Sequence, residues 1–347
     1  MALIFDKHAV ERVLNKNLLP QVSRIDHEGL YPHSMLRGLG DSGAFALKNS
    51  DDLNDTIQLI ENVGTRCATT AFIVWCHTIA IQLLAQSNNK YLKEKLLDDL
   101  YKGLIVGSTG LSNAMKFYAG MEPIQLRGHR INDGYKISGS LPFVSNLGPD
   151  HLFAIIFETD STHRVLALVP CHVMGLSLTE RKNLLGMNGT ATYSCEFKDV
   201  LVPNEWILAE HADEFVRGVR AEFILKQTAV PLGIAQTSLE SIDSLYKESE
   251  MNRYLPIKPE GLSQKIKSLR DQMYDLAKDP HIQNRLMDVM RLRLESTYLA
   301  LETTQAEMLY AGSTGYEMHS HPSRRHRESL FFTLVTPTVK HLEKILT

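Results

Sequence analysis

The spacing of apolar residues changes twice along this 347-residue chain, and this pattern restricts the fold more than any other feature. Between residues 5 and 103 apolar residues recur every three or four positions, as at Val10 and Val13, which is the period of an α-helix. Between residues 104 and 209 short β-branched and aromatic runs alternate with Gly, Pro, Asn and Asp, as strands and turns do. In the last third of the chain the helical period returns.

This order predicts an α+β fold with an N-terminal α-helical domain (1–103), a middle β-domain (104–209) and a C-terminal antiparallel four-helix bundle (210–347). Long helices with short connections are typical of such a bundle. The expected bundle helices are about 213–248, 260–278, 281–312 and 322–346. In the first domain, glycines predict helix ends at 38–40 and at Gly64.

Within the β-domain, the segment 131–135 contains Asp133-Gly134. Asp-Gly tolerates the positive φ angles of a two-residue hairpin loop, so strands are expected on both sides of it. Further strands are expected at 152–158, at 165–170 and in the block around Thr192 that ends near Pro203.

Composition argues against several classes of protein. The chain is 44% hydrophobic and 22% charged with a formal net charge of -3, so no basic surface for nucleic acid is expected. The four cysteines lie far apart without a Cys-x-x-Cys pair, which predicts neither a disulfide framework nor a zinc site. The sequence therefore predicts a cytoplasmic protein with no metal.

Two segments bear on membrane association. Asp6 and Lys7 place charges where a signal peptide needs an apolar core. The weakly polar run 67–85 is about long enough to span a bilayer, but it contains three threonines, His77 and Gln82. A buried helix pair is expected there rather than a membrane span.

Two motifs in the β-domain carry a family resemblance. They are Gly110-Leu111-Ser112-Asn113 and the segment Gly139-Ser140-Leu141-Pro142-Phe143-Val144-Ser145-Asn146. They resemble the Ala-Leu-Thr-Glu and Gly-x-Lys-x-Trp-Ile-Thr-Asn segments that bracket the flavin in the acyl-CoA dehydrogenase superfamily. That family also has the order helices, β-domain, helix bundle, so the resemblance covers nearly the whole chain and implies FAD as cofactor.

The resemblance implies roles for three residues. Ser112 and Ser145 stand where the family has flavin-binding threonines, and Phe143 stands where it has the tryptophan that packs on the flavin. Alternatively, the serines only satisfy strand ends and Phe143 belongs to the core. The spacing of 31 residues between Ser112 and Phe143 favours the flavin site.

A second signature lies near the C-terminus. Gly312-Ser313-Thr314-Gly315-Tyr316 resembles the family's Gly-Gly-x-Gly-Tyr, although alone it is typical of a helix terminus. Eleven residues beyond Tyr316, Arg327-Glu328 matches the family's Arg-Asp pair. In the family these glycines approach the dinucleotide across a subunit boundary, so Gly312 and Gly315 are expected to bind FAD in a homodimer or homotetramer.

The same register exposes a departure from the family. Most dehydrogenases place Glu-Gly-Thr where this chain has Thr336-Pro337-Thr338, and the glutamate is their catalytic base. Thr338 keeps the flavin-contacting hydroxyl, but Thr336 is too weakly acidic to act as a base. Other members carry the glutamate upstream of a Pro-Leu-Gly segment, here 231–233, where Phe223 holds the expected place and Glu222 lies one residue off. Glu222 is thus a candidate base, or else a solvated helix-face carboxylate.

Several arginines complete the expected site. The His- and Arg-rich segment 318–327 is expected to be a solvated loop facing an anion or a partner subunit, and its arginines are expected at the pyrophosphate or coenzyme A phosphates. Arg253 corresponds to the family's phosphate-binding arginine, but the usual Phe-Gly neighbours are absent.

The resemblance implies an FAD-dependent oxidoreductase that oxidises an acyl thioester such as acyl-CoA, or a related small molecule, at the α–β bond. One alternative is a flavin-dependent monooxygenase of the same fold, because several such enzymes lack the glutamate and carry Pro-Phe-x-Ser, as in 142–145 here. Another is a non-catalytic protein that binds flavin or a thioester.

Overall fold

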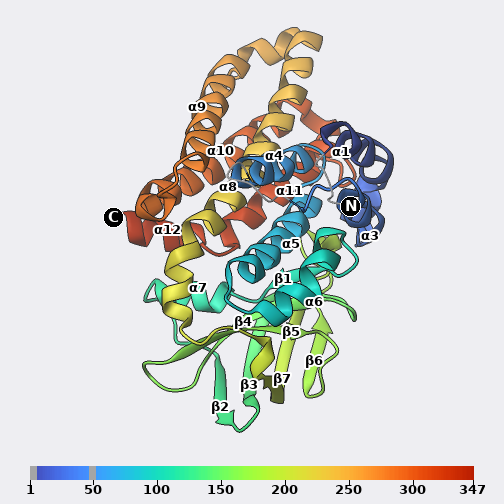
Figure 1. Ribbon diagram of the computed structural model, residues 1–347. Coiled ribbons are helices and arrows are strands. Elements are labelled where there is room, and N and C mark those ends of the chain that lie inside the picture. Colours follow the sequence, from blue (N-terminus) through green and yellow to red (C-terminus); the bar gives the residue numbers. More distant parts are fainter. Residues whose placement is uncertain (1–5, 47–51) are drawn as a thin grey trace.

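The computed structural model of the protein describes residues 6–46 and 52–347. Helices form one part of the molecule and a twisted sheet the other, as Figure 1 shows. The predicted α+β fold class is confirmed. The portions of the helical prediction that fall on residues 1–5 and 47–51 lie outside the described residues.

Helices make up the first hundred described residues. They are α1 (Lys7–Val13), α2 (Val22–His27), α3 (His33–Asp41), α4 (Asp52–Gly64), α5 (Ala68–Gln86) and α6 (Lys90–Tyr101), with a π-helical turn at Leu14–Leu18 and a 3₁₀ turn at Leu19–Gln21. The helix end at Gly64 is confirmed, and the end predicted at 38–40 lies one residue before the last residue of α3, Asp41. A Cβ on Gly40 would lie 2.1 Å from the carbonyl oxygen of Lys102, so close packing on the end of α6 requires this glycine.

Helix α5 is buried along nearly its whole length between the other helices and the sheet (Figure 1). It is a single helix, so the predicted helix pair is wrong. Among the described helices it alone is long and apolar enough to cross a membrane, and 94% of its most apolar window is buried inside the protein. Such burial is typical of a core helix that is apolar all round.

Eight strands form one sheet below the helices (Figure 1). They are β1 (Gly107–Thr109), β2 (Leu126–Ile131), β3 (Gly134–Val144), β4 (Leu152–Glu158), β5 (Arg164–Pro170), β6 (Leu176–Glu180), β7 (Tyr193–Pro203) and β8 (Ile207–Ala209). The sheet order is β6-β7-β3-β2-β4-β5-β8, with β1 paired to β4. Ile131 pairs with Gly134, so the predicted two-residue hairpin loop is present, but it consists of Asn132 and Asp133, and Gly134 is the first residue of β3. The strands predicted at 152–158 and 165–170 are confirmed as β4 and β5.

Strand β4 is buried on both faces, and this fixes the sheet against the helices. Phe153 and Phe157 face the core of the β-domain, whereas Ala154 and Ile156 join the core of the helices. Because successive side chains of a strand point to opposite faces, one strand serves both cores. β1 and the segment after it therefore lie directly beside α5.

The C-terminal third is helical. Its helices are α8 (Ala212–Glu248), α9 (Pro259–Ala277), α10 (Leu286–Ala311), α11 (His321–Leu334) and α12 (Val339–Leu346). The single helix predicted at 322–346 is wrong, because the chain breaks at 335–338 around Pro337, which lacks a backbone N–H. The Thr338 hydroxyl accepts a hydrogen bond from the His341 N–H at 3.2 Å and so caps α12. A further short helix, α7 (Ser112–Tyr118), was not predicted.

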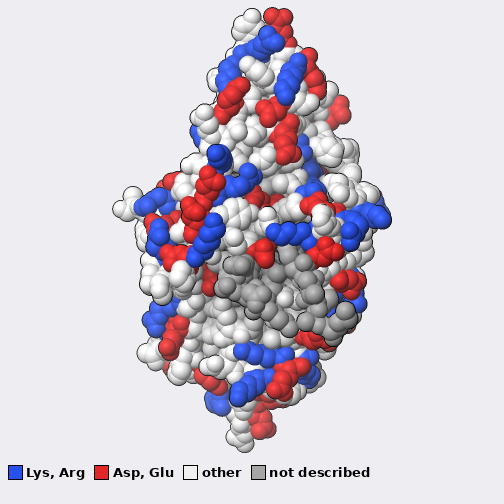
Figure 2. Space-filling view, turned by 45° about the horizontal axis from the view of Figure 1, so that its top comes forward, with Lys and Arg blue, Asp and Glu red and all other residues white. Residues whose placement is uncertain are grey.

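Charges are mixed over the surface. On the face drawn in Figure 2, basic and acidic side chains of the described residues are interspersed. Exposed ion pairs such as Lys265–Glu302 and Arg285–Asp288 contribute between about 0 and 1 kcal/mol each. Such a mixture is typical of a solvated surface.

His77 joins three elements from the middle of α5. Its Nε2 donates to the carbonyl oxygen of Leu100 at 3.0 Å, and its Nδ1 accepts from the Gly107 N–H at 3.0 Å. Only a neutral imidazole can donate and accept in this way. Burial lowers the pKa of His77 from its usual 6.5 to about 4.

We predict that His77 makes the fold sensitive to acid. Below pH 6.5 His77 binds a proton in the unfolded chain, but in the folded chain it does so only near pH 4. The free energy of unfolding therefore falls as the pH falls. At pH 5 this loss is about 2 kcal/mol relative to pH 7. His77→Gln keeps a donor and an acceptor but cannot titrate, so urea unfolding of this variant should lose about 2 kcal/mol less between pH 7 and pH 5.

Burial also lowers the pKa of His151 and of His341, but both groups are present in wild type and variant, so their contributions cancel. His129→Gln, at an exposed position of β2, is the control and should behave as wild type. An equal pH effect in wild type and His77→Gln would contradict the assignment.

Candidate functional site

The main cavity lies where the helices meet the sheet. Its volume is about 490 Å³, and it is lined by Phe72, Trp75, Cys76, Thr109, Gly110, Ser112, Asn113, Met115, Lys116, Glu122, Gln125, Leu141, Pro142, Phe143, Val144, Ser145, Leu184, Leu185, Gly186, Met187, Thr190, Thr192, Phe223, Arg327, Leu330, Phe331, Leu334, Val335 and Thr336. Most of these side chains are apolar. The lining comes from α5, from β1 and α7, from β3, from α8 and from α11, so residues distant in sequence share one wall.

Ser112 is positioned by the chain reversal between β1 and α7. The Gly110 N–H donates to the carbonyl oxygen of Ala154 at 2.8 Å, and a Cβ on Gly110 would lie 3.0 Å from the Leu141 side chain. A small residue is therefore needed before α7 begins at Ser112. The Ser112 and Thr336 hydroxyl oxygens are hydrogen-bonded at 2.7 Å.

Ser145 follows the end of β3, one face of which borders the same cavity. Its hydroxyl is hydrogen-bonded to that of Thr192 at 2.7 Å, and Thr192 is bonded in turn to Thr190 at 2.8 Å. Phe143, two residues earlier, is 56% exposed, and its ring is covered by the Arg181 guanidinium at 5.1 Å. The structure thus brings Ser112, Phe143 and Ser145 to one cavity.

The donor set fits a flat ring with a polar edge and apolar faces, such as a flavin. Three separate segments supply hydroxyls, through Ser112, Ser145 and Thr109, and aromatic and aliphatic side chains supply the faces. The Thr109 hydroxyl is buried and has no hydrogen-bond partner among the described residues. A buried hydroxyl without a partner is costly, so a ligand group that bonds to it would be stabilised.

A thiol and a carboxylate also lie on the wall. Burial raises the pKa of the Cys76 thiol, so it stays protonated near neutral pH. Glu122 is the one carboxylate on the described cavity wall, and it accepts from Asn113 Nδ2 at 2.9 Å and from Lys116 Nζ at 3.5 Å. The described lining therefore offers no carboxylate without a partner.

Glu222 lies apart from the main cavity. It lines a second cavity of about 220 Å³, where its carboxylate accepts from Gln82 Nε2 at 2.7 Å and from Gln86 Nε2 at 3.5 Å. Phe223 lines the main cavity instead. Since successive residues of a helix point about 100° apart, the one-residue offset turns the Glu222 carboxylate away from Ser112 and Thr336.

The arginines of segment 318–327 are not in a solvated loop, so that prediction is wrong. They lie in α11, are buried, and bind carboxylates: Arg324 to Glu328 at 2.9 Å, Arg325 to Glu307 at 2.9 Å, and Arg327 to both oxygens of Asp26 at 2.8 and 2.5 Å. Buried charges require such partners. These guanidinium groups are thus already occupied, rather than free for phosphates.

The remaining predicted cofactor residues do not line the cavity. Thr338 caps α12, so Thr336 is the hydroxyl that reaches the cavity. Arg253 lies in a 3₁₀ turn after α8, and Gly312 and Gly315 follow α10. These two turns are linked, because Asn252 Nδ2 donates to the carbonyl oxygen of Tyr310 at 3.3 Å. The structure brings Arg253 and the two glycines to one end of the bundle but not to Ser112.

Sequence reasoning missed several cavity residues. Thr109 and Thr192 are separated by 83 residues in sequence, and neither lies at a position that the motifs single out. Phe72 and Trp75 lie in α5, whose uniformly apolar sequence does not distinguish a cavity-facing side from a packed one. Among the described residues, no group of three His, Cys, Asp or Glu side chains is placed to hold a metal ion.

Comparison with known proteins agrees with the fold. The family model "Acyl-CoA dehydrogenase, N-terminal domain" matches residues 7–104. The short-chain specific acyl-CoA dehydrogenase of Megasphaera elsdenii is 23% identical over 364 aligned residues, covering 96% of this chain and 93% of that protein.

Solved structures match over almost the full length. Butyryl-CoA dehydrogenase from Megasphaera elsdenii superposes with a TM-score of 0.85 at 20% identity, covering 98% of this chain and 95% of that one. Dibenzothiophene monooxygenase from Paenibacillus sp. A11-2 superposes with a TM-score of 0.81 at 16% identity, covering 98% and 96%. The chain therefore shares the fold of these proteins over nearly its whole length, and its N-terminal helices match the acyl-CoA dehydrogenase N-terminal domain.

Proposed function

We propose that the protein is an FAD-dependent oxidoreductase that acts on an acyl thioester or a related small molecule with an apolar body. The observation that carries this proposal is the convergence of hydroxyls from β1, α7 and β3 on one largely apolar cavity. The names of the curated relatives, which are acyl-CoA dehydrogenases, support the thioester as substrate class. When bound, FAD would supply the hydride-accepting chemistry that the side chains lack.

In this proposal the chain's own residues bind the flavin ring and orient it. Thr109, Ser112 and Ser145 hold the polar edge of the ring, and Phe143 packs on one face of it. Thr336 takes the part first expected of Thr338, because its hydroxyl is the one that reaches the cavity. The apolar walls exclude water, which strengthens each of these hydrogen bonds.

We predict that the purified protein binds FAD and that the cavity hydroxyls contribute to its affinity. Ser112→Ala and Thr109→Val should each weaken binding by roughly 3- to 10-fold, since one hydrogen bond contributes about 1 kcal/mol. Quenching of FAD fluorescence in a titration measures this. Ser194→Ala is the control, because the Ser194 hydroxyl bonds to the Thr179 carbonyl on the neighbouring strand. A protein that stays colourless and gains no thermal stability with excess FAD would refute the proposal.

The reaction itself depends on whether a base is present. Dehydrogenation at the α–β bond requires removal of the α proton, and the wall position at Thr336 carries only a hydroxyl. A flavin-dependent monooxygenase is therefore the second candidate, favoured by the Ser112–Thr336 hydroxyl pair in place of a carboxylate. The fold similarity to a dibenzothiophene monooxygenase is compatible with it.

We predict that a carboxylate at position 223, not 222, acts on substrate. Phe223→Glu should accelerate anaerobic bleaching of bound FAD by butyryl-CoA by at least 100-fold over wild type, because it places a base on the cavity wall. Glu222→Gln should change the rate of bleaching by less than about threefold, as expected of a residue that does not contact the reacting atoms. Stopped-flow absorbance measures both rates. A large loss in Glu222→Gln would instead restore Glu222 as the base.

The wild-type protein then distinguishes the candidate reactions. Rapid bleaching that is lost in Glu122→Gln would identify a dehydrogenase that uses the wall carboxylate. If acyl-CoA leaves the flavin oxidised, the chemically reduced protein should be mixed with oxygen, and reoxidation in two phases rather than one would support the monooxygenase. Neither behaviour would indicate a non-catalytic protein that binds flavin or a thioester.

We also predict a homodimer or homotetramer, because Arg253, Gly312 and Gly315 lie apart from the cavity of their own chain. One FAD can contact the cavity of one subunit and also Arg253, Gly312 and Gly315 if a second subunit supplies these three residues. Gly312 has a φ of +60°, so Gly312→Val strains the backbone and should weaken FAD binding while sparing the cavity. Gly261→Val, also in open space, is the control. A monomeric mass in light scattering at micromolar concentration would contradict this prediction.

A further inference from the structure

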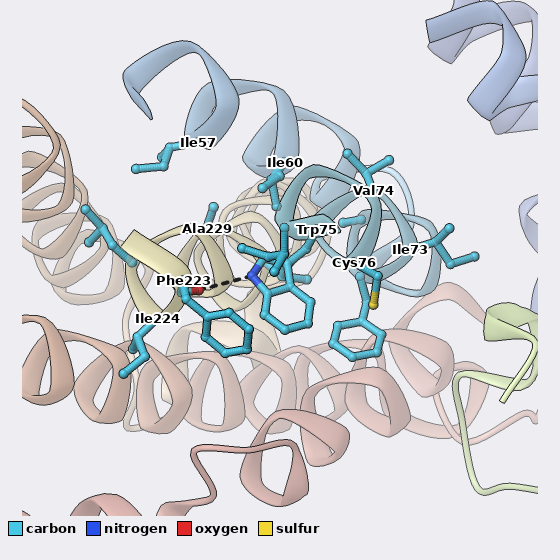
Figure 3. Packing of buried hydrophobic residues seen from close by; sticks show 14 of the residues in the cluster. Ile57, Ile60, Ile73, Val74, Trp75, Cys76, Phe223, Ile224 and Ala229 are labelled. Carbon is cyan, nitrogen blue, oxygen red and sulfur yellow. Dashed lines mark hydrogen bonds between the residues drawn. The ribbon is translucent and has the colours of Figure 1, made fainter. Parts of the chain in front are cut away.

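Trp75 of α5 and Phe223 of α8 both line the main cavity and contact each other. The indole Nε1 donates to the Phe223 carbonyl oxygen at 3.2 Å, and the two ring centroids lie 4.9 Å apart at 75°. Both residues are buried. Figure 3 shows the two rings side by side with this hydrogen bond between them.

The position of Trp75 is fixed from several sides. Phe72 stacks on it at 5.2 Å and 14°, and Phe331 of α11 meets Phe72 edge-on at 4.9 Å. Rotation of the indole would break its hydrogen bond and leave a buried donor without a partner, which is unfavourable. The aromatic pair is therefore a rigid wall.

The second cavity, of about 220 Å³, is lined in part by the adjacent stretches of the same two helices. Thr78 and Gln82 follow Trp75 along α5, and Glu222 and Lys226 flank Phe223 on α8. A charged polar network lines this cavity: Lys226 Nζ donates to Gln82 Oε1 at 2.9 Å, and Gln82 Nε2 donates to Glu222 Oε2 at 2.7 Å.

We propose that Trp75 and Phe223 limit the length of substrate that the main cavity admits, by separating it from the second cavity. The proposal rests on the proposed function in that the main cavity is taken as the substrate site. This length limit predicts that the substrate has a short apolar body. Longer chains are excluded first by the aromatic wall and then by the polar network, since a methyl end there would displace hydrogen bonds without replacing them.

Removal of the wall should have two effects. It should join the cavities, so that longer chains fit. It should also favour a chain whose far end carries a hydroxyl, because Glu222 and Gln82 can hydrogen-bond to a hydroxyl but not to a methyl group.

Binding of straight-chain primary alcohols and of the matching terminal diols, from four to twelve carbons, tests the proposal without turnover. Isothermal titration in the presence and absence of FAD should show that wild-type affinity peaks at a short chain. In Phe223→Ala the peak should move by several carbons, and diols should bind at least tenfold more tightly than alcohols of that length. Phe215→Ala removes a ring of α8 that lines neither cavity, so it should leave the peak unmoved.

Thermal unfolding of each variant verifies folding, and Phe223→Leu replaces Phe223→Ala if the larger truncation unfolds the core. An unchanged length profile in the folded variants, or no binding by any alcohol in wild type and variants alike, would overturn the proposal. Failure of FAD binding with a shifted profile would instead refute the proposed function and leave the wall as described.

Discussion

The burial of α5 on every side is the interaction on which the rest of the structure depends. Its residues from Ala68 to Leu84 are all buried, and the helix packs against α4, α6, β1, α8 and α11. A helix that is apolar on every side is stable only when all of these elements pack against it, because any missing element would expose apolar side chains to water. Because Phe72 and Trp75 belong to this helix, the cavity wall inherits the rigidity of the core. A site built on such an element is already organised before any ligand arrives.

Buried ion pairs hold α11 in register with the helices at the other end of the chain. Arg327 forms an ion pair with Asp26, which lies 301 residues earlier in the sequence. Glu328 accepts hydrogen bonds from the backbone N–H and the hydroxyl of Thr69, at the start of α5, at 3.1 and 2.9 Å. Loss of one partner would leave an uncompensated buried charge, which typically costs 3–5 kcal/mol. These pairs position Thr336, which directly follows α11, against Ser112. The match of Arg327-Glu328 to the family's Arg-Asp pair thus has a structural explanation.

The sequence predicted the features that depend on local chemistry. Helical and strand periods, the Asp133-Gly134 hairpin and the grouping of Ser112, Phe143 and Ser145 all follow from short motifs. The sequence did not predict features that depend on which residues pack against each other in the fold. These are the pairing of Arg324 with Glu328 within α11, the direction of the Glu222 side chain, and the helix break before Thr338. A helix-face carboxylate looks the same in sequence whether it points into a cavity or 100° away.

The Ser112–Thr336 pair has a property that a carboxylate lacks. Either hydroxyl can be the donor, so rotation of two hydrogen atoms reverses the polarity of the bond while every heavy atom stays in place. An ionised carboxylate can only accept, and it changes charge when it gains a proton. The pair therefore keeps this part of the wall electrically neutral while offering either a proton or a lone pair to a neighbour whose own proton count changes. Adaptability here comes from hydrogen positions alone, inside a frame of side chains that does not move.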